Sequence, residues 1–323
     1  MAGAQPQGAA EVLRLAHVEL GVDDIAAARS FYVDLLGFIE HRGDGSCSHL
    51  RGAEEFDCWS LKLTLGEPGL IHSAFRVSQP GNLDTIEAIQ HDLGIPAQRV
   101  PAGTELAQGE ALRTLTPEGH RVEFFHDFDE IDPYLDGNLL LPMRRRVLGG
   151  VPPARIDHVS MRVPDMTAAL AYWVQRLGFG VSEMWIDNDG SVPRVAWVRR
   201  SPRSHDVALG TNPEPAFHHV AFAVSDPAAL LRAADLIGDR QLEDRLEWGP
   251  SRHGATNALA LYVNDPAGNR IELYTGDYSR DLDRPPLVWR PAGYARQGHS
   301  WWGQPPPESF GRTQPLVGAW IGA

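Results

Sequence analysis

The chain contains the same succession of segments twice, and this internal repeat limits what it can fold into more than any other feature. Residues 15–38 (LAHVELGVDDIAAARSFYVDLLGF) align with residues 156–179 (IDHVSMRVPDMTAALAYWVQRLGF). Each copy predicts a strand, an Asp-containing cap, an amphipathic helix and a Leu-Gly-Phe stop. Two more pairs of segments match in the same order: 71–77 with 218–224, and 116–127 with 265–276. We therefore expect two homologous modules with mixed strands and helices, which is an α+β fold.

The repeat also divides the chain. An Arg- and Pro-rich stretch at residues 143–155 separates the two copies. We expect an N-terminal module over residues 1–143, a second module over residues 144–285 and a C-terminal tail over residues 286–323. The tail contains HSWWGQPPPESFGRT, and Pro-rich segments with bulky aromatic residues can pack without regular structure. We expect this tail to cover a pocket of the second module as a lid.

The composition is that of a globular protein with an acidic balance. Asp and Glu number 42 against 29 Lys and Arg, and the net charge of −13 argues against a nucleic acid or an anionic membrane as main partner. Two cysteines, Cys47 and Cys58, cannot build a disulfide framework, which suits a reducing cytoplasm. The chain shows neither a run of about 18 apolar residues nor a signal-peptide pattern, so we expect a cytoplasmic protein.

Three residues of the second module offer metal-ligating atoms from three different predicted strands. His158 lies in the opening strand, His219 in the middle strand and Glu272 in the final strand. The alternation of side chains along a strand turns each of them toward the face that we expect to be buried. Two imidazoles and one carboxylate form the ligand set of many non-haem Fe(II) oxygenases. A single strand histidine is more often structural, so these residues alone leave a metal-free core open.

A wider set of motifs resembles a known family. The motifs are DHVSMRVPD, SHDVALGT, HHVAFAV, GPSRHGATNALALYVNDPAGNRIELYTGDY and WWG, all within residues 155–303. They are similar to type I extradiol catechol dioxygenases of the vicinal oxygen chelate superfamily, in particular to homoprotocatechuate 2,3-dioxygenases. The resemblance implies tandem modules of paired β-α-β-β-β units, each forming a curved, partly open barrel, and a homotetramer. It also implies that His158, His219 and Glu272 hold Fe(II) or Mn(II), while the neighbouring His218 faces away.

The same resemblance implies a reaction and roles for the polar residues around the metal. A substituted catechol would react with O2 to give a 2-hydroxymuconic semialdehyde-type product. His205 matches the acid–base histidine of the family, Tyr262 the tyrosine that hydrogen-bonds the substrate oxygen, and His253 a loop histidine that reaches the ring oxygens. Trp197 matches a ring-packing position, and Ser160 stands where relatives often carry Asn. Without the resemblance, an exposed histidine or a core aromatic residue explains each position equally simply.

The positions that bind the ring substituent depart from the family. Homoprotocatechuate 2,3-dioxygenases hold the substrate carboxylate with arginines, whereas Trp248 stands here before GPSRHG, and Gly298 and His299 precede WWG. An Arg fork binds a carboxylate strongly, while Trp offers an apolar wall, so we expect Trp248 to contact a neutral, larger or aromatic substituent. Arg245 and Arg296 are nearby cations that keep a carboxylated substrate open, and Arg245 is our candidate contact.

The first module retains the ligand types of the second. The aligned residues are His17, His72 and Glu123. The positions aligned with the proton-handling residues of the second module differ: Cys58 for His205, Arg113 for Tyr262 and Thr104 for His253. A metal ion bound there would lack those partners, so we expect a vestigial or structural site.

Other functions of the same architecture stay open at this point. A dioxygenase like 4-hydroxyphenylpyruvate dioxygenase would use the same ligands on a non-catechol substrate, but it gives no reason for the combination of His205, Tyr262 and His253. A metal-free protein that sequesters small molecules would use the aromatic walls alone, and its metal content would distinguish it. A lyase or epimerase would need an additional carboxylate near the metal, and no residue at a matching place supplies one.

Overall fold

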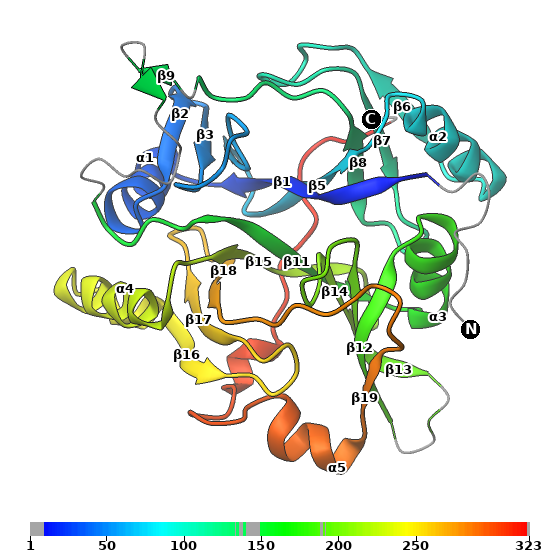
Figure 1. Ribbon diagram of the computed structural model, residues 1–323. Coiled ribbons are helices and arrows are strands. Elements are labelled where there is room, and N and C mark those ends of the chain that lie inside the picture. Colours follow the sequence, from blue (N-terminus) through cyan, green and yellow to red (C-terminus); the bar gives the residue numbers. More distant parts are fainter. Residues whose placement is uncertain are drawn as a thin grey trace.

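Each copy of the sequence repeat forms one mixed β-sheet. The computed structural model describes residues 10–132, 134–135, 138–139, 149–187, 190 and 192–321. In Figure 1 the sheet of the first module occupies the upper half of the molecule and the sheet of the second module the lower half. The predicted α+β class with two tandem modules is confirmed. The predicted boundary between residues 143 and 144 lies outside the described residues.

The first sheet has eight described strands in the order β2-β3-β4-β1-β5-β8-β7-β6. Their bounds are β1 (Val12–Val22), β2 (Ile39–Gly43), β3 (Cys47–Arg51), β4 (Leu61–Leu65), β5 (Gly69–Val77), β6 (Ala97–Val100), β7 (Ala111–Leu115) and β8 (Arg121–Phe125). A separate two-stranded ribbon follows, formed by β9 (Tyr134–Leu135) and β10 (Asn138–Leu139).

The second sheet has nine described strands in the order β16-β17-β18-β15-β11-β14-β13-β12-β19. Their bounds are β11 (Arg155–Val163), β12 (Gly180–Ile186), β13 (Pro193–Arg199), β14 (Val207–Thr211), β15 (Ala216–Ala223), β16 (Leu246–Arg252), β17 (Leu259–Asn264), β18 (Arg270–Thr275) and β19 (Leu287–Trp289). The central order β14-β11-β15-β18-β17-β16 repeats the order β4-β1-β5-β8-β7-β6 of the first sheet. The predicted repeat is therefore a repeat of strand pairing as well as of sequence.

The helices are few and lie outside the sheets. They are α1 (Ile25–Arg29) with η1 (Ser30–Leu35), α2 (Asn82–Asp92), α3 (Met166–Leu170) with η2 (Ala171–Arg176), α4 (Pro227–Asp239), η3 (Glu243–Arg245), α5 (Pro291–Gly293) with η4 (Tyr294–Gly298), and η5 (Glu308–Gly311). Asp24 and Asp165 cap α1 and α3 with their side-chain oxygens, as the repeat predicted. Gly37 and Gly178 end these helices at φ of 87° and 72°, a region that favours glycine.

The two modules share one hydrophobic core. Strands β1 and β11 contact each other where the sheets meet, and buried residues of both sheets form one cluster. Phe38 of the first module packs edge-on against Phe222 of the second, with ring centroids 4.8 Å apart. The two modules therefore support each other's central strands, which carry the residues discussed below.

The tail connects the two modules. Strand β19 pairs with β12, Gln314 bridges to Phe217 of β15, and Leu316 bridges to Leu70 of β5. In Figure 1 this red segment runs upward from the second module to the strands of the first. Its last described part includes Trp320, whose indole donates to the Thr114 carbonyl at 3.0 Å.

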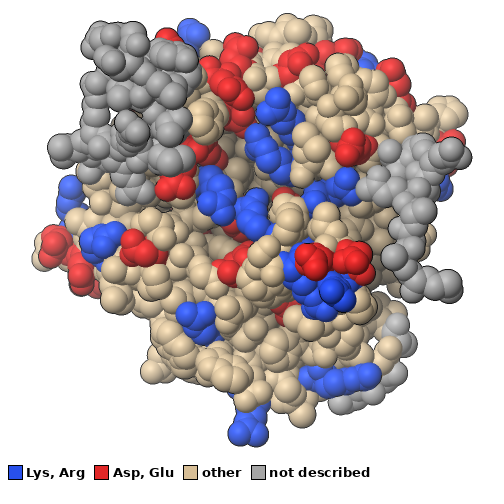
Figure 2. Space-filling model, in the orientation of Figure 1, with Lys and Arg blue, Asp and Glu red and all other residues tan. Residues whose placement is uncertain are grey.

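Figure 2 shows acidic side chains gathered mainly over the first module, with a largely uncharged surface and scattered Lys and Arg over the lower part of the second. Within the described part of the chain, none of the helices has both the length and the apolar character needed to cross a membrane.

Candidate active site

Adjacent strands at the centre of the second sheet carry His158, His219 and Glu272. They belong to β11, β15 and β18, and Ala221 of β15 pairs with His158 on one side and with Glu272 on the other. His219 precedes Ala221 by two residues and so points to the same face of β15. Strand pairing thus brings together three side chains that are far apart in the sequence, as the alternation pattern predicted.

The three ligating atoms of this group form a small, nearly equilateral triangle. The His158 Nε2 atom lies 3.2 Å from His219 Nε2 and 3.0 Å from Glu272 Oε2, and the His219 and Glu272 atoms lie 3.1 Å apart. In an octahedral ion with bonds of about 2.1 Å, neighbouring ligand atoms are about 3 Å apart. The group therefore fits one face of an octahedral metal ion, and all three residues are buried.

The charges of the group favour a cation at its centre. Burial by itself would lower the pKa of His158, but the carboxylates of Asp157 and Glu272 outweigh it and raise that pKa to about 9. Burial lowers the pKa of His219 to about 4 despite Glu272. Burial would raise the pKa of Glu272, but both imidazoles hold it well below its ordinary value. Without metal, the anionic Glu272 is thus neutralised by a proton on His158, and a metal ion would replace that proton.

Hydrogen bonds behind His219 leave its metal-facing nitrogen unprotonated. The His218 Nε2 atom lies 2.8 Å from the Phe310 carbonyl, which can only accept, so Nε2 of His218 carries a proton. The other nitrogen of a neutral His218 then accepts from His219 Nδ1, 2.6 Å away. The expectation that His218 faces away is wrong, because this buried ring lines the cavity and orients His219. The Nδ1 atom of His158 is held similarly, 3.1 Å from Asp157 Oδ1.

His205 packs against the metal-binding group. Its ring centroid lies 3.9 Å from that of His158, and its Nδ1 atom lies 2.8 Å from Ser204 Oγ. The Ser204 hydroxyl donates to Asp277 at 2.9 Å, so it accepts from His205, and Nε2 of His205 stays free. Burial and then the neighbouring His158 lower the pKa of His205 well below its ordinary value. The ring is therefore neutral and can take up a proton at Nε2.

Tyr262 and His253 form a hydrogen-bonded pair on the other side of the group. His253 Nδ1 donates to the His299 carbonyl at 2.7 Å, which leaves Nε2 to accept from the Tyr262 hydroxyl at 3.1 Å. Burial lowers the pKa of His253, whereas burial and then Glu272 raise the pKa of Tyr262 well above its ordinary value. Both groups are neutral at pH 7 and offer a polar edge beside the metal-binding group.

These residues line one cavity of about 570 Å³. Its wall includes the metal-binding group, His205, Tyr262, His253 and Trp197, together with Trp185, Tyr294 and Phe310. Residues of the tail form part of this wall. A cavity of this size, lined by aromatic and small apolar side chains together with a cluster of polar groups, is typical of a small-molecule site.

Trp248 and Arg245 occupy other places than we predicted from the sequence. Neither is among the described residues that line the cavity. The Trp248 ring stacks on Tyr262, with centroids 5.3 Å apart and planes 7° apart, and its indole donates to the Gln304 carbonyl at 2.8 Å. Arg245 donates to the Asp265 carbonyl at 2.8 Å. We therefore correct the predicted role of Trp248, which supports Tyr262 from behind instead of forming the wall itself.

Known proteins share both the sequence and the fold. Residues 155–273 match the Glyoxalase/Bleomycin resistance protein/Dioxygenase superfamily, and residues 70–128 match the catechol 2,3-dioxygenase-like N-terminal domain. The metapyrocatechase of Pseudomonas sp. (strain CF600) is 33% identical over 282 residues, which are 86% of this chain and 91% of that protein. The chain belongs to the extradiol catechol dioxygenases.

Solved structures extend this result to the whole chain. Homoprotocatechuate 2,3-dioxygenase from Brevibacterium fuscum, in complex with 3,4-dihydroxyphenylacetate, is 35% identical with a TM-score of 0.88 and covers 97% of this chain and 95% of its own. The Arthrobacter globiformis enzyme is 34% identical with a TM-score of 0.88, covering 97% and 94%. The predicted family and enzyme class are confirmed, and this dioxygenase has a His-His-Glu group typical of Fe(II)- and Mn(II)-dependent members.

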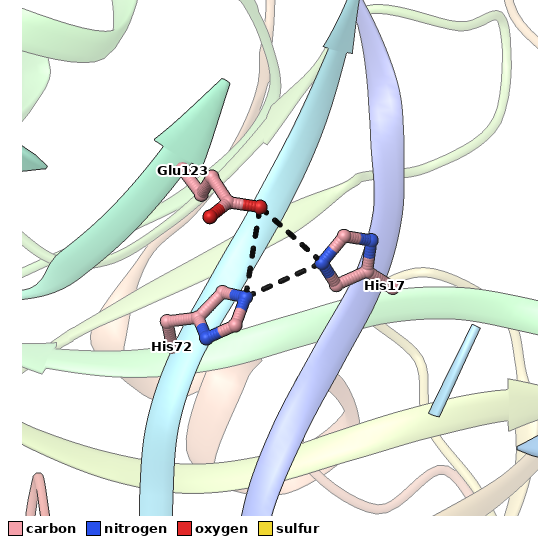
Figure 3. A group of neighbouring side chains, drawn as sticks. All are labelled: His17, His72 and Glu123. Carbon is pink, nitrogen blue, oxygen red and sulfur yellow. Dashed lines mark hydrogen bonds and ion pairs between the residues drawn. The ribbon is translucent and has the colours of Figure 1, made fainter. Parts of the chain in front are cut away.

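The first module of this dioxygenase contains a second His-His-Glu group. Figure 3 shows His17, His72 and Glu123 turned toward one another from β1, β5 and β8. Ala74 pairs with His17 and with Glu123, which repeats the strand pairing around Ala221. The His17 Nε2 atom lies 3.3 Å from His72 Nε2 and 3.7 Å from Glu123 Oε1, and the His72 and Glu123 atoms lie 3.9 Å apart. This triangle is wider than that of the second module.

Strand pairing corrects one predicted replacement in the first module. The pairing of β1 with β4 and of β11 with β14 places Trp59, not Cys58, at the position of His205. The Trp59 ring lies 4.2 Å from the His17 ring, as the His205 ring lies 3.9 Å from that of His158. The turn between β4 and β5 is one residue shorter than the turn between β14 and β15, and the sequence alignment placed this difference before β4 instead of after it.

From the sequence we also predicted that Arg113 and Thr104 of the first module take the places of Tyr262 and His253. Arg113 pairs with Glu123 across the strands as Tyr262 pairs with Glu272, so this predicted equivalence is confirmed. Its guanidinium donates to Glu123 Oε2 at 2.7 Å. Thr104 is exposed and donates to the Pro101 carbonyl of its own loop at 2.7 Å, so it has no counterpart of the His253 contact.

Like Arg194, which is paired with Asp187 at 2.8 Å, Arg162 is an arginine that lines the cavity and that we missed from the sequence. It lies on β11, four residues after His158, and lines the cavity together with Ser160. The three residues alternate with buried core residues along the strand, so the pattern that identified His158 could have identified Arg162. Arg296, which we considered from the sequence, is exposed and is not among the described lining residues.

Proposed function

We propose that this dioxygenase binds Fe(II) through His158, His219 and Glu272 and cleaves substituted catechols beside their two hydroxyl groups. The spacing of the three ligating atoms carries the proposal, because it fits one face of an octahedral ion. The bound ion would supply the redox chemistry that allows O2 to react with the catechol. Mn(II) is the second candidate, since the manganese-dependent 2,3-dihydroxybiphenyl 1,2-dioxygenase of Geobacillus genomosp. 3 is 28% identical over 91% of this chain and 95% of that protein.

The protein groups around the ion handle protons and orient the substrate. His205 is neutral with a free Nε2 atom, so it takes up a proton at the reacting oxygen and returns it later. Tyr262 donates to His253, and its hydroxyl oxygen is therefore free to accept from a catechol hydroxyl. Trp197 contributes an aromatic wall for the ring. The product would be a yellow 2-hydroxymuconic semialdehyde-type compound.

We further propose that catalysis takes place in the second module, residues 144–285, under the tail of residues 286–323. Phe310 of the tail holds His218, and His299 holds His253, so the tail supports the polar residues of the site as well as covering it. This contribution supports the interpretation of the tail as a lid.

Oxygen uptake tests the proposed function. The protein is loaded with Fe(II) or with Mn(II) and offered 3,4-dihydroxyphenylacetate, catechol, 4-methylcatechol and 2,3-dihydroxybiphenyl. We expect O2 consumption equal to the yellow product formed with at least one of them. An absence of uptake with every catechol and both metals would contradict the proposal.

A further inference from the structure

Arg162 is a cation inside the active-site cavity. Its guanidinium is largely enclosed by protein, and its side chain lines the same cavity as His158. Burial and then the neighbouring Arg270 lower the pKa of Arg162 to about 10, so the group stays charged at neutral pH.

No carboxylate neutralises Arg162 within the described part of the chain. Its one side-chain hydrogen bond there is a long contact of 3.4 Å from Nη1 to Ser160 Oγ. The neighbouring Arg270, by contrast, is paired with Glu247 at 2.6 Å. An enclosed charge is costly unless it is paired. Arg162 therefore offers an unused binding partner to an anion that enters the cavity.

Gly210 provides the space that the Arg162 guanidinium occupies. It pairs with Arg162 across β11 and β14 and also lines the cavity. A Cβ atom at Gly210 would lie 2.5 Å from Nη1 of Arg162, a distance that would force the guanidinium to move. The side chain of Arg162 is thus accommodated by the absence of one on the facing strand.

We propose that Arg162 binds an anionic ring substituent of the substrate, a carboxylate on a short side chain. This inference rests on the proposed function and specifies its substrate class. Four residues of strand separate Arg162 from His158, about 13 Å between their Cα atoms, so the anion lies at the end of the catechol away from its hydroxyl groups. From the sequence we expected a neutral substituent in contact with Trp248. We now expect an anionic substituent instead, because Arg162 lines the cavity and Trp248 does not. A guanidinium can hold a carboxylate through two parallel hydrogen bonds.

The test compares a carboxylated catechol with a neutral one. KM is measured for 3,4-dihydroxyphenylacetate and for 4-methylcatechol in the wild type, Arg162→Met and Gly210→Ala, which crowds the guanidinium without removing it. We expect the ratio of the two KM values to rise about 100-fold in Arg162→Met and to rise in Gly210→Ala as well. Arg296→Met, which changes an exposed cation of the tail, is the control for general charge effects. A ratio that stays the same in Arg162→Met and Gly210→Ala overturns the proposal.

A binding measurement separates this proposal from the proposed function. Calorimetry records the binding of phenylacetate to the metal-free protein, which requires no ring cleavage. If no catechol is cleaved but phenylacetate binds to the wild type and not to Arg162→Met, the anion site stands while the function fails. If catechols are cleaved and phenylacetate binds equally to both proteins, the function stands and the anion site fails.

The metal-ligating group of the first module carries a second, independent inference. Its ligating atoms lie 3.3, 3.7 and 3.9 Å apart. In a tetrahedral ion with bonds of about 2.1 Å, neighbouring ligand atoms are about 3.4 Å apart, against about 3 Å in an octahedral ion. The wider triangle of His17, His72 and Glu123 therefore fits an ion with four ligands better than one with six.

Buried charges around this group orient His72 for metal binding. The His72 Nδ1 atom lies 3.1 Å from Glu19 Oε2, and Glu19 is in turn held by Lys62 at 3.1 Å and by Thr64 at 2.6 Å. The carboxylate of Glu19 thus lies behind the ring, while Nε2 of His72 faces the centre of the group. A carboxylate behind a ligating histidine is the usual arrangement at protein metal sites.

The group is closed and contains an unused buried oxygen. Trp59 and Phe125 lie against His17, and Trp320 of the tail stacks on His72 with ring centroids 5.2 Å apart. Gln108 is buried and donates to Glu123 Oε1 at 2.7 Å, while its own amide oxygen has no partner among the described residues. Turned over by half a rotation, that amide would place its oxygen beside Glu123 Oε1, so Gln108 is our candidate for the fourth ligand.

The geometry points to a closed zinc site at His17, His72 and Glu123, completed by Gln108 and without a catalytic role. Metal analysis tests it in protein refolded or grown with Zn(II) and Fe(II). We expect one zinc and one iron per chain in the wild type, and His72→Ala and Gln108→Ala should lower zinc while keeping iron. His41→Ala, at an exposed histidine, is the control for adventitious binding.

Cobalt gives a readout that does not depend on activity or on the stability of a variant. Co(II) with four ligands absorbs visible light far more strongly than Co(II) with six. We expect the cobalt-loaded wild type to show the strong bands, and His17→Asn to lose them while the weak bands of the second module remain. One metal ion per chain in the wild type with weak bands only would overturn the proposal.

Discussion

The two modules hold the same three ligand types on the same paired strands, yet they differ in what surrounds them. In the second module His158 lies beside a cavity, next to the neutral His205. In the first module His17 lies against the indole of Trp59, and Trp320 closes over His72. The ligands alone therefore do not make an active site. An open face and a proton acceptor next to it distinguish the module to which we assign catalysis from its copy.

Removal of one metal-binding histidine from each module should give the largest difference in activity between the two modules. His158→Ala should remove the iron of the second module and lower ring cleavage by about 1,000-fold or more, because the ion is needed for the reaction. The matched His72→Ala should keep iron and most of the cleavage rate. Metal content per chain and O2 uptake measure both effects. If His158→Ala keeps iron and activity, catalysis belongs to the first module instead.

Exchange of the residue beside the first histidine should have the next largest effect. His205→Ala should keep metal and catechol binding but lower turnover by about 100- to 10,000-fold, because no neutral base remains near the reacting oxygen. Trp59→Ala, its counterpart in the first module, should leave turnover within about twofold. Stopped-flow spectra of the yellow product measure turnover, and equilibrium titration measures catechol binding. Equal turnover in His205→Ala and the wild type would remove His205 from its role.

The fold and the metal-binding residues could be predicted from the repeat. The same succession of strand, cap and helix patterns occurs in both halves of the sequence, so both halves were expected to pair their strands in the same order. Asp24 and Asp165 cap their helices as predicted, and both His-His-Glu groups assemble where side-chain alternation combines with the pairing of three strands. The residue beside His17 was harder to predict, since the turn after β4 is one residue shorter than the turn after β14, and a gap placed before β4 instead exchanges Trp59 for Cys58.

Contacts made by the tail could not be predicted from the pattern of the strands. His218 is oriented by the carbonyl of Phe310, 92 residues later in the chain. Trp248 is fixed by the carbonyl of Gln304, and this bond turns its ring onto Tyr262 instead of into the cavity. Both errors have one physical cause, because the direction of a side chain at the end of a strand depends on the segment that covers it.

A smaller effect is expected at the residues that face the two carboxylate ligands. Tyr262→Phe should lower turnover by about tenfold through the loss of one hydrogen bond to the substrate, with little change in stability. Arg113→Met should instead lower stability by about 1–3 kcal/mol and spare turnover, because buried Glu123 loses a donor at 2.7 Å. Urea unfolding and O2 uptake separate the two outcomes. A loss of turnover in Arg113→Met at full stability would contradict the assignment of catalysis to the second module.

The smallest effect is expected on the pH dependence of stability, at two equivalent hydrogen bonds that join the modules. His120 of the first module donates from Nε2 to the Arg162 carbonyl at 2.8 Å, and the aligned Asn269 of the second module donates to the Gly21 carbonyl at 3.0 Å. The two bonds are equivalent by the repeat, but only His120 titrates. Burial lowers its pKa to about 4, against about 6.5 in the unfolded chain.

Between pH 6.5 and 4 the unfolded chain therefore binds a proton that the folded chain excludes, so stability falls as pH falls through this range. The loss attributable to His120 should be about 1 kcal/mol at pH 5.5 and approach 3 kcal/mol near pH 4. His120→Asn copies the residue of the second module, keeps a donor and should remove this part of the pH dependence. Urea unfolding of both proteins from pH 7 to pH 4.5 measures the difference. Parallel pH profiles would mean that His120 takes up a proton in the folded protein as readily as in the unfolded chain, and that the two ends of the contact differ in charge at low pH.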